Sequence, residues 1–244
     1  MILLDCGNST LKSQLRDAGR LRTSFATSYD GDWTGRLSRW MRELDAKHCY
    51  LASVLDTERQ ALLEACLQER FDAAVTRFVS QARDGGVINA YTQPERLGDD
   101  RWVALIGALD MAIGDCIVID AGSAITLDLL RSDGQHLGGA ILPGVNTSPE
   151  RFRQIFSYID FDDPAVAGGD EPGCSTEAAI QIDYPHRSLD RLRDLVTNWK
   201  QRLDHNAGIL LAGGDAPRVQ AELEHPSRIV PDLVFRGIYR LATI

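Results

Sequence analysis

The chain has 244 residues, 44% of them hydrophobic, and a formal net charge of −9 at pH 7. This acidic balance argues against broad electrostatic binding of nucleic acid, so we expect no nucleic-acid partner and infer that local positive groups hold any anionic substrate. No apolar run approaches the roughly 20 residues that span a bilayer, which predicts no membrane association. The five cysteines are widely spaced and form no CxxC pair, a pattern typical of reduced thiols in a cytoplasmic protein.

The first half of the chain predicts a three-stranded meander followed by alternating helices and strands. An apolar run before Asp5, an alternating segment at 11–15 and a turn at 17–20 indicate the meander. The elements expected after it are helices at 32–44, 56–71 and 101–113, strands at 49–54 and 74–79, and a polar loop at 84–101.

The pattern then restarts with a second meander that has the same Asp-x-Gly corner. The expected elements are strands at 116–119, 123–130 and 136–142, a helix at 146–159, a polar loop at 160–173, a helical region at 175–203 interrupted near Pro185, a strand at 208–212, a helix at 215–223, a strand at 228–230 and a helix at 231–241. Ser148 is the expected N-cap of the helix at 146–159. The duplication predicts two similar α/β lobes, 1–114 and 115–244, with a cleft between them. Two unrelated domains that share a common turn are the alternative.

Two short stretches suit a metal-bound phosphate. In Asp5–Lys12, a carboxylate at a strand end precedes a Gly-Asn-Ser turn and a lysine. The carboxylate attracts a hard cation, the small residues let backbone N–H groups approach phosphate oxygens, and Lys12 adds positive charge. Asp120–Ala124 repeats the corner after another apolar run. The sequence has neither GxGxxG nor GxxxxGK[ST], which disfavours Rossmann and P-loop folds. The five histidines form no metal-ligand pattern and are interpreted as surface or hydrogen-bonded structural residues.

Taken in order, these residues resemble the motifs of the type III pantothenate kinases, within the ASKHA superfamily of acetate and sugar kinases, heat-shock chaperones and actin. The resembling segments span nearly the whole chain: Asp5–Lys12, Tyr91–Pro94, Leu97–Trp102, Asp120–Thr126, Gly138–Gly144, Thr176 with Ala179–Ile180, Gly213–Ala216 and Leu233–Gly237. The resemblance implies an α/β fold of duplicated ribonuclease-H-like, actin-like lobes, each a mixed sheet with flanking helices, and an active site in the cleft. Ser9 and Ser123 stand where the family usually has threonine, and Gln181 replaces a common glycine.

The resemblance also implies a reaction, the ATP-dependent phosphorylation of pantothenate to 4′-phosphopantothenate, which is the first step of coenzyme A biosynthesis. The attacking hydroxyl must lose a proton, so a carboxylate is needed within hydrogen-bond reach. Asp100, in a polar loop just ahead of a helix, is the expected general base. Its alternative role is to cap that helix and to pair with Arg101.

The remaining site residues are assigned by the same resemblance. ATP with Mg²⁺ is expected at Asp5, Cys6, Gly7, Asn8, Ser9, Thr10, Leu11, Lys12 and Ser123. Pantothenate is expected at Tyr91, Gly98, Asp99, Asp100, Arg101 and Thr176. Asp120 matches the position that holds a monovalent cation, K⁺ or NH₄⁺, and Gly213–Gly214 is expected near the nucleotide. Structural alternatives stay open: Tyr91 packing on its lobe, Thr176 as a helix N-cap, and Gly213–Gly214 as a strand-to-helix turn. Residues 145–165 match little and receive no ligand role.

Members of this family are dimers with the substrate site at the subunit interface, so the resemblance implies a homodimer. Two other functions stay open, namely an ASKHA kinase of another small hydroxylated acid and a non-enzymatic regulatory accessory factor. The Tyr91 loop favours pantothenate over other acceptors. The retained Lys12, Asp100 and Asp120 favour catalysis.

Overall fold

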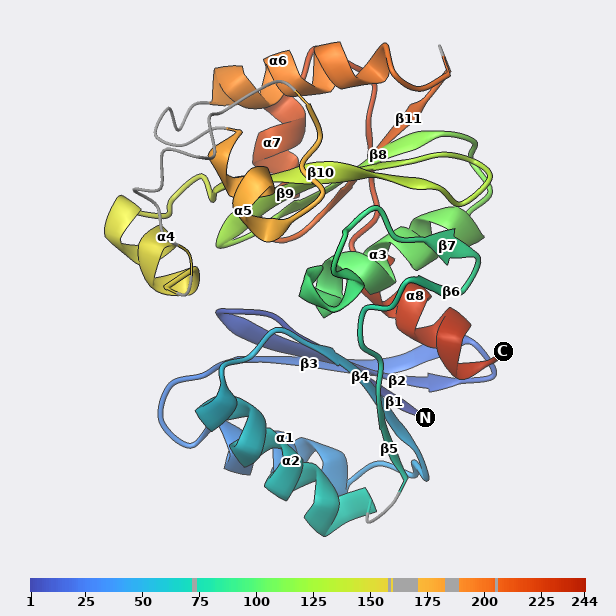
Figure 1. Ribbon diagram of the computed structural model, residues 1–244. Coiled ribbons are helices and arrows are strands. Elements are labelled where there is room, and N and C mark those ends of the chain that lie inside the picture. The colour runs from blue at the N-terminus through green and yellow to red at the C-terminus, as the bar shows by residue number, and fades with distance from the viewer. Residues whose placement is uncertain (72–73, 158, 160–170, 183–188, 205) are drawn as a thin grey trace.

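The computed structural model describes residues 1–71, 74–157, 159, 171–182, 189–204 and 206–244. Two five-stranded mixed sheets lie on either side of a central pair of helices (Figure 1). The strands are β1 (Ile2–Cys6), β2 (Thr10–Asp17), β3 (Arg20–Ser28), β4 (Cys49–Ser53), β5 (Val75–Arg77), β6 (Arg83–Asp84), β7 (Val87–Ile88), β8 (Cys116–Ala121), β9 (Ala124–Leu130), β10 (His136–Pro143), β11 (Gly208–Ala212) and β12 (Arg228–Ile229). The helices are α1 (Trp33–Arg42), α2 (Thr57–Phe71), the 3₁₀ turn η1 (Pro94–Arg96), α3 (Asp99–Asp110), α4 (Pro149–Ile155), α5 (Thr176–Gln181), α6 (Leu189–Lys200), α7 (Ala216–Glu222) and α8 (Leu233–Ala242).

The two sheets have the same plan. Their strand orders are β3-β2-β1-β4-β5 and β10-β9-β8-β11-β12, so each contains a meander whose first strand also pairs in parallel with a later strand. The meanders at both sequence-predicted positions are therefore confirmed. In the described part of the chain, no helix is both long and apolar enough to cross a membrane.

Alternation along the first strand of each sheet decides which side chains reach the cleft. In β1, Ile2 and Leu4 belong to the core beneath α1 and α2, while Leu3 belongs to the core around α3 and α8. Because successive side chains point to opposite faces, Asp5 shares the inner face with Leu3. By the same period of two in β8, Asp120 shares the inner face with Val118. The two carboxylates therefore face one another from different sheets.

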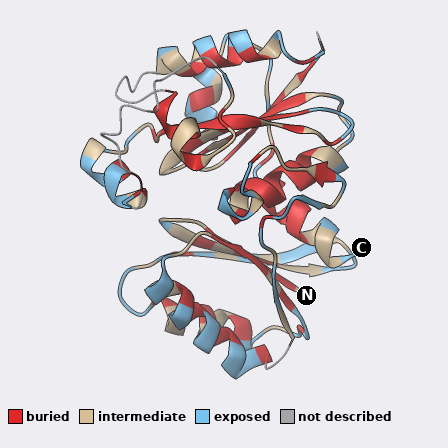
Figure 2. Ribbon diagram, in the orientation of Figure 1, coloured by how far each residue is buried: buried red, intermediate tan, exposed pale blue. Residues whose placement is uncertain are grey.

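Helices α3 and α8 fill the space between the sheets and are buried along most of their length (Figures 1 and 2). They pack closely because glycines lie where they cross. A Cβ added at Gly237 would lie 1.8 Å from the carbonyl oxygen of Val103, and one added at Gly107 would lie 2.4 Å from that of Leu233. Helix α8 also contacts β1 and β4 of the first sheet. The last helix thus ties the two halves together, and the boundary at 114/115 stays a prediction.

Several predicted boundaries are wrong. Helix α3 begins at Asp99, so Asp100 lies in its first turn rather than in a preceding loop. The expected loop at 84–101 contains the small β6–β7 ladder and η1. Helix α4 covers only Pro149–Ile155, although Ser148 caps it as expected by accepting the N–H of Arg151. Residues 160–170 of the expected polar loop, and the interruption near Pro185, lie outside the described residues.

Replacing Gly237 with alanine is expected to lower the free energy of unfolding by about 1–3 kcal/mol, because the added methyl group overpacks the α3–α8 crossing. Urea denaturation measures the change. Gly214→Ala is the matched control for stability, since a Cβ there has no atom within 4 Å. Equal stability of the Gly237→Ala variant and the parent chain would show that the crossing is not tightly packed.

Candidate active site

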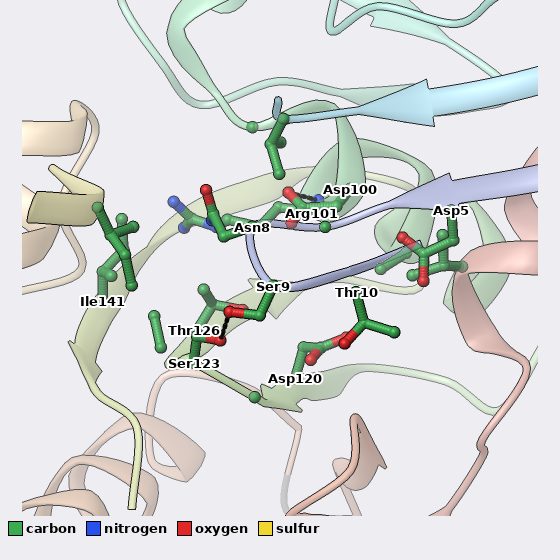
Figure 3. Close-up of a pocket in the computed structure, with 18 of the residues that line it drawn as sticks. Asp5, Asn8, Ser9, Thr10, Asp100, Arg101, Asp120, Ser123, Thr126 and Ile141 are labelled. Atoms are coloured by element: carbon green, nitrogen blue, oxygen red, sulfur yellow. Dashed lines mark hydrogen bonds between the residues drawn. The ribbon is translucent and has the colours of Figure 1, made fainter. Parts of the chain in front are cut away.

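A cavity of about 440 Å³ lies in the cleft, between the β1–β2 turn, the β8–β9 turn and the start of α3 (Figure 3). Its polar lining includes five carboxylates, those of Asp5, Asp100, Asp120, Asp128 and Asp215. The rest of its wall is partly apolar and comes from both halves of the chain. The apolar lining residues are Val54, Ala104, Val118, Ala124, Ile141, Ile155, Phe156 and Val234.

The two phosphate-binding turns predicted from the sequence meet across this cavity. The Ser9 and Ser123 hydroxyl oxygens are 2.7 Å apart and share a hydrogen bond, drawn as a dashed line in Figure 3. Lys12 lies opposite Asp5 in the β1–β2 ladder, and its Nζ is 4.0 Å from the Asp5 carboxylate. Gly7, Asn8 and Thr10 line the cavity as well.

Two members of the predicted ATP stretch do not line the cavity. The side chains of Cys6 and Leu11 are fully buried in the core beneath α1 and α2. Alternation explains this placement, because they are paired across β1 and β2 on the face opposite to Asp5 and Lys12. Their side chains therefore stabilise the turn from behind rather than facing the space that a phosphate would enter.

Burial raises the pKa of Asp5, Asp100 and Asp120, and the charge of Asp120 adds to the effect at Asp5 and Asp100. Burial is the main cause that raises the pKa of Asp5 to about 7; Lys12 opposes it, and Asp120 and Asp100 add to it. Burial also raises the pKa of Asp100 to about 6, with Asp120 adding to the effect. Burial raises the pKa of Asp120 too, while the nearby Lys12 lowers it. A site with this much negative charge favours a cation or a cation-bound ligand.

Asp100 is held by the first turn of α3. Its Oδ1 accepts the N–H of Arg101 at 2.7 Å, one of the helix-start donors that have no partner within the helix. Gly98 is the N-cap, so the expected alternative, in which Asp100 itself caps the helix, is not what the structure shows. A Cβ at Gly98 would lie 2.7 Å from Asp100 Oδ1, so glycine leaves the space that this carboxylate occupies.

The neighbouring residues Asp99 and Arg101 have different surroundings. Asp99 points away from the cavity, where it accepts the N–H of Ser80 and a hydrogen bond from Arg77, both at 3.0 Å. Arg101 lines the cavity, but its Nε and Nη2 donate to the two oxygens of Asp128 at 2.9 and 2.6 Å. Its Nη1 donates to the hydroxyl of Tyr91 at 2.8 Å. Asp99 is thus placed to stabilise the start of α3, while Arg101 is mostly occupied by protein partners.

Thr176 lines the cavity from α5, and its hydroxyl donates to the carbonyl oxygen of Arg96 at 3.0 Å. The N-cap of α5 is Ser175, whose side chain accepts the N–H of Ala178, so Thr176 is not the cap. Tyr91 does not itself line the cavity and lies behind Arg101, with the guanidinium carbon 5.6 Å from its ring centroid. Gly214 lines the cavity, and Gly213 makes the turn after β11 at φ +88°.

Sequence reasoning missed four kinds of contribution to this site. It did not single out Asp128 or Arg96, and it treated all histidines as structural without noting His136 beside Asp128. It also gave no ligand role to 145–165, yet Ile155 and Phe156 line the cavity. Asp128 carries a signal that sequence alone offers, because it is a carboxylate within a strand whose other residues, apart from Thr126, are apolar.

Among the described residues, no group of three or more His, Cys, Asp or Glu side chains is arranged to hold a metal ion alone. The oxygen donors of Asp5 and Asp120 nevertheless suit a hard cation. Mg²⁺ is commonly held by one or two carboxylates together with substrate phosphates and water. The donor set therefore fits a cation that arrives with a phosphorylated ligand.

Solved structures share this two-lobed fold. A conserved putative Baf family transcriptional activator from Campylobacter jejuni aligns with a TM-score of 0.55 and 21% identity, covering 100% of this chain and 98% of that one. A putative 2-dehydro-3-deoxygalactonokinase protein from Sinorhizobium meliloti aligns with a TM-score of 0.53 and 13% identity, covering 99% and 97%. The fold is thus one of duplicated, actin-like α/β lobes, as expected from the sequence.

Sequence comparison narrows the class to one family. A model of the family described as type III pantothenate kinase matches residues 1–185. The type III pantothenate kinase of Azotobacter vinelandii is 33% identical, covering 98% of this chain and 96% of its own length. That of Pseudomonas paraeruginosa is 35% identical, covering 98% and 97%. The chain belongs to the type III pantothenate kinase family.

Replacing Asp5 with asparagine is expected to raise the free energy of unfolding at pH 8 by about 2–4 kcal/mol and to change it little at pH 4. The folded-state pKa of Asp5, about 7, lies above the ordinary value of 3.8, so the folded chain binds this proton more tightly than the unfolded chain does. The ionised carboxylate therefore destabilises the fold progressively as the pH rises from about 4 to 7.

Urea denaturation at both pH values measures this difference. Asp17→Asn is the control, because it removes a carboxylate from an exposed pair with Arg22. If Asp5→Asn stabilised the chain as much at pH 4 as at pH 8, the raised pKa of Asp5 would be contradicted.

Proposed function

We propose that this chain transfers the γ-phosphate of ATP to pantothenate, which yields ADP and 4′-phosphopantothenate in the first step of coenzyme A biosynthesis. Membership of the type III pantothenate kinase family supports the reaction. The observation that carries the assignment of roles is the position of Asp100. It is a half-buried carboxylate that faces the same cavity as both of the turns proposed to bind phosphate.

The two turns supply the phosphate site. Backbone N–H groups of small residues between Gly7 and Thr10 approach phosphate oxygens closely, while Lys12 provides charge from β2. Ser123 contributes its hydroxyl from the other sheet. When a phosphate enters, it replaces the hydrogen bond between Ser9 and Ser123 with bonds from each hydroxyl to the ligand. The transferring group is thus held from both lobes, which is the positioning that phosphoryl transfer requires.

Asp100 takes the proton from the attacking hydroxyl of pantothenate. Its pKa of about 6 keeps it mostly ionised at neutral pH, while making it a stronger base than an ordinary aspartate. The start of α3 fixes the carboxylate through the N–H of Arg101. Asp5 and Asp120 are the residues that would hold cations here, and the Mg²⁺ that accompanies ATP would neutralise phosphate charge during transfer.

Pantothenate is placed along the wall formed by Gly98, Arg101 and Thr176, with Tyr91 behind Arg101. Its carboxylate and amide suit the guanidinium and hydroxyl donors, and its branched carbon chain suits the apolar side chains of Ile141, Ile155 and Phe156. Asp99, which also belongs to the predicted binding set, acts through the position of α3. A homodimer and a cytoplasmic location remain predictions from the resemblance and from the cysteine pattern.

A kinase of another small hydroxylated acid and a non-enzymatic accessory factor are the competing functions. Incubation with ATP and a panel of pantothenate, sugars and short hydroxy acids separates them, with ADP formation as the readout. ADP formation only with pantothenate is the expected result. Preference for another acceptor supports the first alternative, and nucleotide binding without transfer to any acceptor supports the second.

Replacing Asp100 with asparagine is expected to lower kcat by about 10²–10⁴-fold and to leave pantothenate binding within a few-fold, because the amide cannot accept the proton. Steady-state kinetics and calorimetric titration of pantothenate measure the two quantities. Asp17→Asn, an exposed carboxylate far along β2, is the control that keeps parental turnover. Unchanged kcat in Asp100→Asn would remove the general-base assignment.

Activity is expected to be several-fold higher in K⁺ buffer than in Na⁺ buffer of equal ionic strength. Burial of Asp120 disfavours its charged form, and a fitting monovalent cation beside it offsets that cost and the repulsion of nearby phosphates. The initial rate at saturating ATP and pantothenate is the measurement. Equal rates in the two buffers would contradict a monovalent-cation site at Asp120.

A further inference from the structure

A buried polar cluster adjoins the proposed pantothenate wall and includes one of its residues, Arg101. It contains Arg101, Asp128, His136 and Tyr91, whose exposed fractions are 6%, 2%, 0% and 4%. Arg101 comes from α3, Asp128 from β9 and His136 from β10, so the cluster joins the helix that carries Asp100 to the second sheet. The proposed mechanism uses Arg101 and Tyr91 but leaves the two sheet residues without a role.

We propose that Asp128 and His136 are positioning residues for pantothenate: Asp128 orients the guanidinium of Arg101 toward the cavity, and His136 ties Asp128 to the backbone of the Tyr91 loop. This inference rests on the proposed function and extends it to residues that act through Arg101. It concerns acceptor binding rather than the phosphate site, which lies on the turns of β1–β2 and β8–β9.

The hydrogen bonds of Arg101 show what Asp128 does. Three of the five N–H groups of a guanidinium are used, two by the carboxylate of Asp128 and one by Tyr91. Nη1 and Nη2 each carry a second N–H. Within the described part of the chain, neither of these two N–H groups has a hydrogen-bond acceptor. Because Arg101 lines the cavity, these two donors are available to a substrate carboxylate or amide.

The side-on pair with Asp128 fixes the plane of the guanidinium, and with it the direction of the free donors. Burial raises the pKa of Asp128, but the charge of Arg101 and the hydrogen bonds from His136 and Arg101 outweigh it and hold the pKa at about 2. Asp128 is therefore ionised throughout the working range of pH. Loss of its charge would leave a buried guanidinium without its counter-ion, free to turn.

His136 forms hydrogen bonds through both of its ring nitrogens. Its Nδ1 accepts the backbone N–H of Ala90 at 3.3 Å, so this nitrogen carries no proton, and its Nε2 donates to Oδ1 of Asp128 at 2.9 Å. The ring is therefore the neutral tautomer with its proton on Nε2. It also stacks on Tyr91, with ring centroids 6.3 Å apart and an angle of 19° between the planes. One side chain thus fixes the carboxylate, the loop backbone and the aromatic ring together.

The backbone of β10 leaves space for this cluster of side chains. The β9–β10 register shifts between His136 and Gly139, a bulge that re-aims side chains at this end of β10. A Cβ at Gly139 would lie 2.5 Å from Nη2 of Arg101 and 2.6 Å from Oδ1 of Asp128. The second glycine of the Gly138–Gly144 motif therefore has a physical reason, since glycine at 139 makes room for the buried pair.

The test compares His136→Leu, His136→Gln and Asp128→Asn by steady-state kinetics with each substrate varied in turn. His136→Leu and Asp128→Asn are expected to raise the KM for pantothenate by about 10-fold or more and to leave the KM for ATP within about 2-fold. His136→Gln keeps an amide that donates toward Asp128, so its KM for pantothenate is expected between those of the parent and His136→Leu. The controls are His225→Gln, whose imidazole shares a hydrogen bond with Thr197 at the surface, and Asp17→Asn.

A purely structural role gives a different result. Partial unfolding lowers the active fraction, and hence the apparent kcat, but it does not change the KM of the molecules that remain folded. The inference would be overturned if the variants had the KM values of the parent chain for both substrates, or if both KM values rose equally. In that case the proposed function would still stand, provided that the parent chain phosphorylates pantothenate. A parent chain that does not phosphorylate pantothenate would overturn the proposed function, and this inference with it.

Discussion

The convergence of Asp5, Asp100 and Asp120 on one cavity in the cleft is the constraint on which the rest of the structure depends. Like charges in a poorly solvated space repel and lose hydration, and their raised pKa values express that cost. The fold tolerates them because Lys12 partly compensates and because α3 and α8 pack tightly between the sheets. The arrangement is suited to a ligand that brings its own cations.

The scaffold explains why these three carboxylates meet. Two strands with the same alternation carry Asp5 and Asp120 to facing sides of two sheets, and the first turn of α3 carries Asp100 between them. Each position follows from the periodicity of its own element, with no unusual backbone at the residue itself. The duplicated plan therefore places the two turns proposed to bind phosphate symmetrically, while the proposed acceptor site depends on the single loop and helix between the halves.

Local signals explain why much of this was predictable. An aspartate at a strand end followed by small residues defines each of these turns within about five residues, and both turns are where the sequence predicts them. The start of α3 was misplaced because Gly98 caps it without a side chain, so the usual capping signal is missing. The surroundings of Arg101 and Asp99 could not be predicted, since they depend on Asp128 and Ser80, which only tertiary structure brings near.

The proposed function requires that the γ-phosphate of ATP pass to the primary hydroxyl of pantothenate in this cavity. The most direct measurement is identification of the product by mass spectrometry and ³¹P NMR after the purified chain is incubated with ATP, Mg²⁺, K⁺ and pantothenate. The account predicts one phosphomonoester on the primary hydroxyl of pantothenate, formed in equal amount with ADP. ADP released together with inorganic phosphate, and no phosphorylated pantothenate, would contradict it.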